Sequence, residues 1–323
     1  MSRVDDLHVF LHWVETFWGH ISSVGWTALG IGLALHFFRV SLRVRAWQNI
    51  LRAAYPDVRV PFRGVFGAYF AGVGVNSIAP ARGGDLVKLF LVKRRVQGST
   101  YPTLGSTLLA ETLFDLVVSG ALLLWAAEAG LLPGVPDLPS LPAFDWSFVA
   151  RHPRLSAIIG SVLLAAGILG VTWASHRVRE FWARVRQGLA ILRDPRAFLT
   201  QVVSWQLVSW LARIGTVFFF LRAFHVEATL RTALAVVVVS SLSTLLPFTP
   251  GGLGTQQAVL LFVLAGTASR SAVLAFSVGM QLAVSALNVA VGFAAIFLML
   301  GTLRWRRHAA ADAAGASGRP ASG

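Results

Sequence analysis

Long apolar stretches, separated by short polar breaks, run through most of the chain. Five of them are predicted to be membrane-spanning helices, at residues 24–38, 102–125, 155–173, 197–220 and 271–300. Several approach or exceed the ~20 apolar residues that a helix needs to cross a bilayer. Helices are expected because lipid tolerates only segments whose backbone hydrogen bonds close internally.

Two further apolar stretches, at residues 64–92 and 232–265, are interrupted where a helix should continue. The first contains VNSIAPARGGDLVK and the second contains PFTPGGLG, so each places proline and paired glycine inside an apolar run. Non-helical backbone is tolerated at membrane depth only where protein or a wet cavity satisfies its polar groups. We therefore predict two re-entrant hairpins, each of which enters and leaves the membrane by the same face.

The two breaks resemble one another in sequence and in surroundings. Pro80 and the glycine pair after it correspond to Pro247 and the pair at 251–252. Either break alone is also typical of an ordinary helix kink, but matched breaks in two halves of a chain indicate a transporter repeat. Because one connecting span separates the two units, the second is predicted to be inverted relative to the first.

The predicted fold class is an all-α polytopic membrane protein, with about five full spans, two re-entrant helical hairpins in an inverted repeat, and amphipathic interfacial helices. We divide the chain into an N-terminal interfacial helix (1–22), a first repeat (23–126), an acidic loop with a connecting span and a basic amphipathic helix (127–196), a second repeat (197–302), and a basic, then disordered tail (303–323).

Composition agrees with this class, and charge predicts an orientation. Hydrophobic residues make up 55% of the 323 residues and charged residues only 13%, too few to cover a soluble domain. The net charge of +14 comes mainly from arginines beside apolar segments, which indicates the positive-inside bias rather than nucleic-acid binding. The basic stretches 39–63, 176–196 and 304–307 are therefore predicted to be cytoplasmic. The acidic loop 127–150 and the N-terminus are then predicted to lie outside, and the C-terminus in the cytoplasm. The expected location is the cell membrane.

Several kinds of chemistry are not expected. The chain has no cysteine, which excludes thiolate catalysis, disulfides and cysteine metal sites. We also find no DxD motif and expect no histidine in the membrane core that could act as a base. The sequence therefore predicts no metal, no cofactor and no catalytic residue.

Residues 176–193, HRVREFWARVRQGLAILR, have the spacing of an amphipathic helix. Arginines lie away from an apolar face formed by Val178, Phe181, Trp182, Val185, Leu189 and Leu192. Such a helix is predicted to lie on an anionic membrane surface.

The two breaks are candidate binding sites. A helix that begins after Gly84 would present backbone N–H groups with partial positive charge, which bind anions, so Gly83 and Gly84 are counted with the site. Arg82 and Lys88 add full charges, and arginine can hold a phosphate with two hydrogen bonds. The second break offers similar backbone and polar but uncharged side chains, at Pro250, Gly251, Gly252, Gly254, Gln256 and Gln257.

Charged residues also occur inside predicted spans. Glu111 and Asp115 lie one helical turn apart in 102–125, and Arg213 lies near the middle of 197–220. Each charge costs roughly 2.5–3.5 kcal/mol at the centre of a membrane helix, so such residues often mark transport pathways or proton relays. The alternative is a buried ion pair between Arg213 and one of the carboxylates. Gln281, Ser285 and Asn288 lie on one side of the last predicted span and are predicted to make hydrogen bonds between helices.

Three motifs resemble the transmembrane family of lysylphosphatidylglycerol synthases, over about residues 25–300. The first family motif is matched by Asn76, Pro80, Arg82, Gly84, Asp85 and Lys88. The second, Glu-Arg-x-x-Asp, keeps Glu111 and Asp115 but has Thr112 in place of arginine. The third is matched by Pro250, Gly251, Gly252 and Gly254, with Gln257 in place of an acid.

The resemblance implies translocation of lipids between leaflets. Some family members also carry a soluble aminoacyltransferase domain, which is not expected here because the chain ends shortly after its last predicted span. Residues Thr112 and Gln257 depart from the family pattern and argue for a different substrate.

The leading hypothesis is a lipid flippase or scramblase, not an enzyme, that moves a phosphate-containing headgroup through a cavity between the hairpins. Arg82 and Lys88 would hold the phosphate, and Asn76 would orient it. Asp85, Glu111 and Asp115 would contact a cationic group or carry a proton, and Arg213 would balance them. The expected partners are anionic or zwitterionic membrane lipids.

Two alternatives stay open. One is a membrane enzyme that acts on a lipid phosphate or lipid-linked sugar, with Asp85 as acid and Arg82 as electrophile. The other is a membrane subunit that works with a separate lipid-modifying enzyme.

Overall fold

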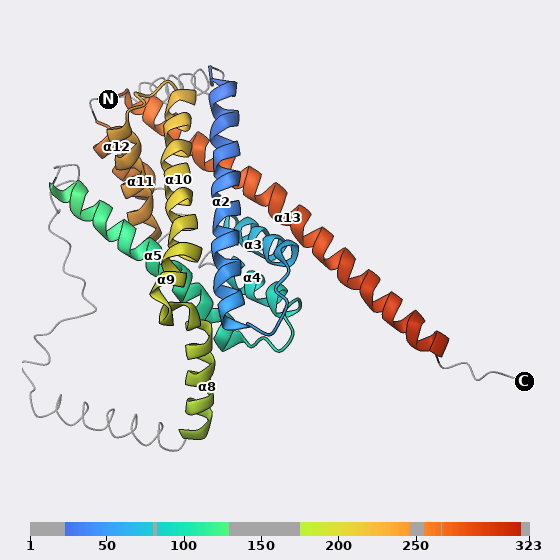
Figure 1. Ribbon diagram of the computed structural model, residues 1–323. Helices are drawn as coiled ribbons and strands as arrows, with labels where there is room; N and C mark the ends of the chain where they lie inside the picture. The colour runs from blue at the N-terminus through green and yellow to red at the C-terminus, as the bar shows by residue number, and fades with distance from the viewer. Residues whose placement is uncertain (1–22, 80–82, 129–174, 246–254, 266, 318–323) are drawn as a thin grey trace, which may run out of the picture.

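The computed structural model describes residues 23–79, 83–128, 175–245, 255–265 and 267–317, and these residues fold into helices (Figure 1). Four of the described helical segments are long and apolar enough to cross a membrane: Trp26–Ala54, Tyr101–Trp125, Pro195–Ala223 and Arg270–Met299. The predicted span at 155–173 and the predicted N-terminal interfacial helix lie outside the described residues. The all-α membrane class is confirmed, whereas the count of five spans stays a prediction.

Helix α2 (Trp26–Ala54) is much longer than the predicted span at 24–38. The basic stretch 39–54, predicted to be loop, is helical, because apolar positions continue at helical spacing and Val44, Trp47 and Leu51 are fully buried. The helix ends before Pro56, which disfavours helical backbone at Tyr55.

A continuous rod packs antiparallel to α2 (Figure 1), and consists of α9 (Pro195–Phe198), a π-helical turn η2 (Leu199–Val203) and α10 (Ser204–Ala223). Asp194 caps its start by accepting the Ala197 N–H at 3.0 Å. Gly25 N donates to Ala223 O at one end of the pair, and Asn49 Nδ2 donates to Gln201 O in the π turn at the other.

Helices α3 (Phe62–Asn76) and α4 (Gly83–Lys93) form the two arms of the first predicted hairpin. They approach closely, because a Cβ added at Gly84 would collide with the carbonyl oxygen of Gly72. On its other side α3 crosses α13 (Arg270–Ser317), where Gly74 and Gly292 meet backbone to backbone. The break between two short helices is confirmed, and the re-entrant path through the membrane stays a prediction.

The second predicted hairpin corresponds to α11 (Leu230–Leu245) and α12 (Thr255–Val263). The break between them, 246–254, lies outside the described residues. The inverted repeat therefore stays a prediction.

Two other segments differ from expectation. The amphipathic helix predicted at 176–193 is divided into α8 (Ser175–Gly188) and a 3₁₀ turn η1 (Ala190–Arg193). Gly188 packs against the first turns of α5 (Tyr101–Glu128), while Phe181 and Trp182 are exposed. Helix α13 continues to Ser317, although we expected disorder after Arg307, because the tail is rich in alanine, the best helix former.

The buried apolar side chains form two clusters. The first is built from the second half of α2, the hairpin α3–α4, the start of α5 and Met299 of α13. The second joins α10, α11 and α12 to the start of α13. Polar side chains of α2, α3, α4 and α5 meet beside the first cluster, and these form the candidate site.

Candidate functional site

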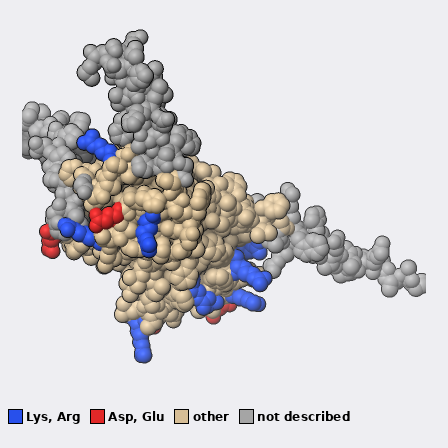
Figure 2. Space-filling view, turned by 90° about the horizontal axis from the view of Figure 1, so that it is seen from above, with Lys and Arg blue, Asp and Glu red and all other residues tan. Residues whose placement is uncertain are grey.

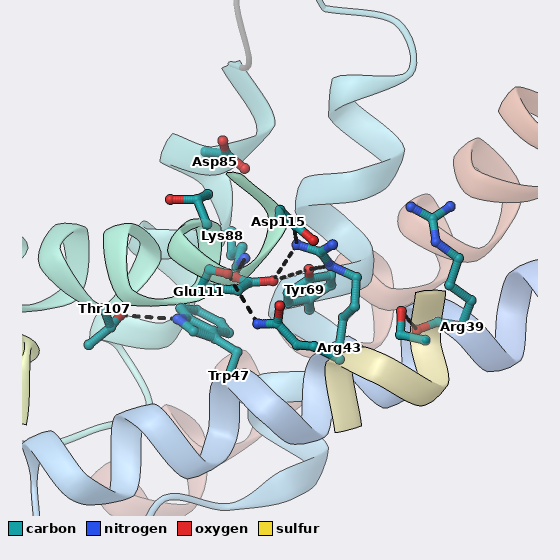
Figure 3. A network of polar contacts seen from close by, with 12 residues as sticks. Arg39, Arg43, Trp47, Tyr69, Asp85, Lys88, Thr107, Glu111 and Asp115 are labelled. Carbon is teal, nitrogen blue, oxygen red and sulfur yellow. Dashed lines mark hydrogen bonds and ion pairs between the residues drawn. The ribbon is translucent and has the colours of Figure 1, made fainter. Parts of the chain in front are cut away.

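Glu111 of α5 is the centre of a buried polar network (Figure 3). Its side chain is 3% exposed and accepts from three donors on three other helices. Arg43 Nη2 of α2 lies 3.0 Å from Oε1, Lys88 Nζ of α4 lies 3.1 Å from Oε2, and the Tyr69 hydroxyl of α3 donates to Oε1. This carboxylate therefore joins all four helices. We call Arg43, Tyr69, Lys88, Glu111 and Asp115 the Glu111 cluster.

Arg43 bridges Glu111 and Asp115 of α5. Its Nη2 lies 2.7 Å from Asp115 Oδ2 as well as 3.0 Å from Glu111, and its Nε donates to the Tyr69 hydroxyl at 2.9 Å. Sequence reasoning missed Arg43 because it placed this residue in a loop. The signal that could have found it is the apolar periodicity of Val40, Val44 and Trp47, which keeps Arg43 on a helix.

Lys88 was predicted to hold a phosphate, but in the structure it forms an ion pair with Glu111. It is buried, and its ammonium group lies 3.8 Å from the ring centre of Tyr69 and 4.2 Å from that of Trp47. Trp47 is held in place by its Nε1–H, which donates to Thr107 at 3.0 Å. Aromatic faces and a carboxylate together replace the water that the ammonium loses.

Asn76 and Asp85 close the junction between α3 and α4. The Gly84 N–H, one of the unpaired donors expected to bind an anion, instead donates to Asn76 Oδ1 at 2.7 Å. Asn76 Nδ2 in turn donates to Asp85 Oδ1 at 3.3 Å. Asn76 therefore acts as a helix cap supplied from the neighbouring helix. Gly83 is described at the start of α4, while Arg82 lies outside the described residues.

Replacing Asn76 with alanine removes this cap and leaves the Gly84 N–H without its acceptor. We expect the free energy of unfolding to fall by about 1 kcal/mol, as for other helix caps. Thermal unfolding in detergent measures the change. Ile78→Ala, at an exposed position two residues away that makes no cap, is the control. An equal melting temperature for the two variants would contradict the cap.

A pocket of about 240 Å³ opens beside the Glu111 cluster. It brings together five of the site residues predicted from the sequence with side chains from α2, α3 and α5. Its lining consists of Arg43, Tyr69, Val73, Asn76, Asp85, Lys88, Leu108, Glu111, Thr112 and Asp115. The pocket is therefore polar, and its walls come from helices that the sequence predicts to lie in the membrane.

An ion pair between Arg213 and Glu111 or Asp115, the alternative left open by the sequence, is not among the ion pairs of the described residues. The Arg213 guanidinium lies 4.8 Å from the ring centre of Trp210, whose Nε1–H donates to Asp115 at 2.9 Å. Gln206, one turn earlier on α10, donates to the backbone oxygen of Glu111 at 3.1 Å. The polar face of α10 thus contacts α5, but through Trp210 and Gln206.

His36 lies within the span that the sequence predicts at 24–38. It is buried on α2, and its Nε2 lies 2.9 Å from Asn288 Oδ1 of α13. Asn288 Nδ2 donates to Ser77 Oγ at 3.2 Å, so the predicted interhelical role of Asn288 is confirmed. This chain of hydrogen bonds joins α2, α13 and the end of α3.

Of the second predicted site, only part falls within the described residues. Gln256 and Gln257 begin α12 and are buried, and Gln256 Nε2 donates to Ser240 Oγ of α11 at 3.1 Å. Neither lines the pocket beside Glu111. Pro250, Gly251, Gly252 and Gly254 lie outside the part of the chain that the structure describes.

The model of one protein family, described as the lysylphosphatidylglycerol synthase TM region, matches residues 8–292. The chain belongs to this family. In the pattern of the family an arginine lies between the two acids of the second motif, where this member has Thr112. Arg43 of α2 bridges these acids here, so a guanidinium is present although it comes from another helix.

Three relatives are similar to this family member. A UPF0104 membrane protein of Methanocaldococcus jannaschii is 23% identical over 190 residues, which are 59% of this chain and 78% of the relative. A UPF0104 membrane protein of Methanothermobacter thermautotrophicus is 24% identical, over 75% of this chain and 74% of the relative. Glycosyltransferase AglD of Haloferax volcanii is 26% identical over 70% of this chain, which spans 41% of AglD.

Proposed function

We propose that this family member moves a phosphate-containing lipid headgroup between membrane leaflets, as a flippase or scramblase. The observation that carries the proposal is the pocket beside Glu111, which is lined by three acids and two bases within helices of a membrane protein. Charges in such a place are costly and are retained mainly where they serve a pathway. The substrate classes are phospholipids, aminoacyl-phospholipids and polyprenyl-phosphate lipids.

The network supports passage because its charges are balanced in pairs. Arg43 and Lys88 neutralise Glu111 and Asp115, so the empty pocket is polar without a large net charge. A headgroup that brings its own phosphate or amine could exchange partners with these pairs one at a time. Leu86, Leu113 and Leu116, each of which follows a pocket-lining residue in the sequence, are exposed and offer apolar surface for lipid tails.

Transport of fluorescent lipids in proteoliposomes tests the proposal. Purified protein is reconstituted with headgroup-labelled phospholipids, and a membrane-impermeant reductant then reports the fraction that reaches the outer leaflet. We expect reduction of the inner-leaflet lipid at a rate well above that of protein-free vesicles. An unchanged rate with phospholipid, aminoacyl-phospholipid and polyprenyl-phosphate lipids would overturn it.

Filling the pocket should stop transport without unfolding the protein. Thr112 is exposed and lines the pocket, so Thr112→Trp adds bulk where a headgroup would pass. We expect at least a tenfold slower rate with an unchanged melting temperature. Leu124→Trp adds similar bulk at an exposed position of the same helix outside the pocket, and should transport normally. Equal transport rates for the two variants would show that lipid does not pass through the pocket.

The likeness to Glycosyltransferase AglD favours a second candidate, a role in lipid glycosylation. In that case the chain would be an enzyme, or a membrane subunit of one, that acts on a lipid-linked sugar. Incubation of the purified protein with a polyprenyl-phosphate sugar and an acceptor lipid tests this, with transfer of radiolabelled sugar as the readout. We propose transport rather than catalysis, so no transfer is expected.

A further inference from the structure

Arg39 and Arg213 are two further charged residues next to the Glu111 cluster. Arg39 precedes Arg43 by one turn of α2, and both Arg39 and Arg213 are partly buried. The helices touch at this level, because Ser209 Oγ of α10 donates to the backbone oxygen of Arg39 at 3.3 Å. Arg213 follows Ser209 by one turn of α10, so both arginines lie at this contact between α2 and α10. Figure 3 shows the Arg39 side chain apart from the contacts around Glu111.

Neither arginine has a counter-charge among the residues that the structure describes. Asp115 is within electrostatic reach of both, but its Oδ2 lies 2.7 Å from Arg43 and its Oδ1 accepts from Trp210. Glu111 is bound by Arg43 and Lys88. The balanced cluster therefore leaves two adjacent positive charges uncompensated.

Uncompensated arginines are unfavourable at this position. Membrane helices carry a charged residue only at a cost, and two like charges side by side add repulsion. A bound anion removes both effects. Phosphate fits the geometry of arginine better than most anions, because the planar guanidinium forms paired hydrogen bonds to its oxygens.

We propose that Arg39 and Arg213 together bind the phosphate of an anionic membrane lipid. The proposal rests on the proposed function and moves the phosphate site away from Lys88, which is paired with Glu111.

Lipid binding measured by native mass spectrometry tests the site. The purified protein is titrated with phosphatidylglycerol and with diacylglycerol of the same acyl chains, which lacks the phosphate. We expect the wild type to bind phosphatidylglycerol at least tenfold more tightly, and Arg39→Gln and Arg213→Gln each to lose most of this preference. Arg222→Gln, which removes an exposed charge from the end of the same helix, should keep it.

Melting temperatures give an independent readout. Without added lipid, the two glutamine variants should be as stable as the wild type or more stable, because an uncompensated charge is lost. Phosphatidylglycerol should raise the melting temperature of the wild type and of Arg222→Gln only. If a glutamine variant does not fold, Arg39→Lys and Arg213→Lys keep the charge but lose the paired hydrogen bonds, and a severalfold weaker preference is expected.

Three results would overturn the site. Unchanged phosphatidylglycerol preference in the Arg39 and Arg213 variants shows that the phosphate binds elsewhere. Displacement of the lipid by millimolar inorganic phosphate identifies a free anion rather than a lipid as the ligand. Stability that falls in both glutamine variants, with or without lipid, shows that the arginines have a counter-charge in the protein. Because binding and transport are measured separately, retained binding without transport would contradict only the proposed function.

Discussion

Replacing Glu111 with glutamine is expected to lower the free energy of unfolding by about 3–5 kcal/mol, because it leaves the buried Lys88 and the half-buried Arg43 with one carboxylate fewer. Glutamine has nearly the same size and still accepts a hydrogen bond from Tyr69, so the change isolates the charge. Lys88 should be affected most, since Arg43 retains Asp115. Chemical denaturation in mixed micelles measures the loss.

Two comparisons make this result specific. Glu227→Gln removes an exposed carboxylate and should change stability little. Adding Lys88→Met to Glu111→Gln removes the stranded ammonium, so the double variant should be more stable than the sum of the single changes predicts. A Glu111→Gln protein as stable as Glu227→Gln would mean that the ion pairs around Glu111 do not form.

Replacing Gly84 with alanine is expected to have the second large effect. The new Cβ would collide with the carbonyl oxygen of Gly72 and lie 2.7 Å from Asn76 Oδ1. The Gly72 oxygen is backbone, so α4 must move away from α3, and the hydrogen bond from Gly84 N–H to Asn76 is lost with it. We expect a loss of about 2–3 kcal/mol in the free energy of unfolding, typical of an overpacked contact, and no lipid transport.

The neighbouring glycine provides a matched control. Among the described residues, a Cβ at Gly83 meets only the Ala79 Cβ, at 3.6 Å, which is an ordinary contact. Gly83→Ala should therefore fold and transport lipid at nearly the wild-type rate. If both alanine variants lose transport while keeping wild-type stability, the glycine pair serves a ligand rather than the helix contact.

The same glycine pair shows what the sequence could and could not predict about this site. It correctly predicted a break between two short helices at this place. The sequence did not reveal which group lies against the backbone of this pair, because an anion and a neighbouring helix both require the absence of a side chain. We expected an anion at the backbone of Gly84, and the structure places α3 and Asn76 there.

Charge patterns had a similar limit. The acids of α5 were recognised because each is isolated within an apolar helix, a local property of the sequence. Their partners come from α2 and α4, and Arg43 was assigned to a loop because arginine-rich stretches usually flank spans. No local pattern indicates which helix supplies a counter-charge, so Arg213 was chosen as the obvious intramembrane cation. The structure pairs Arg43 and Lys88 instead.

The crossing of α3 and α13 has a consequence for biosynthesis. Ser77 and Asn288, whose side chains are hydrogen-bonded across this crossing, are 211 residues apart in the chain. At ~5–20 residues per second a ribosome needs about 10–40 s to make that interval. During this time the glycine face of α3 has no partner from α13, and the first hairpin must wait in the membrane half-assembled. Chaperones or proteases that survey the bilayer therefore meet this protein with the glycine face of α3 still uncovered, although the four helices that carry the Glu111 cluster are already made.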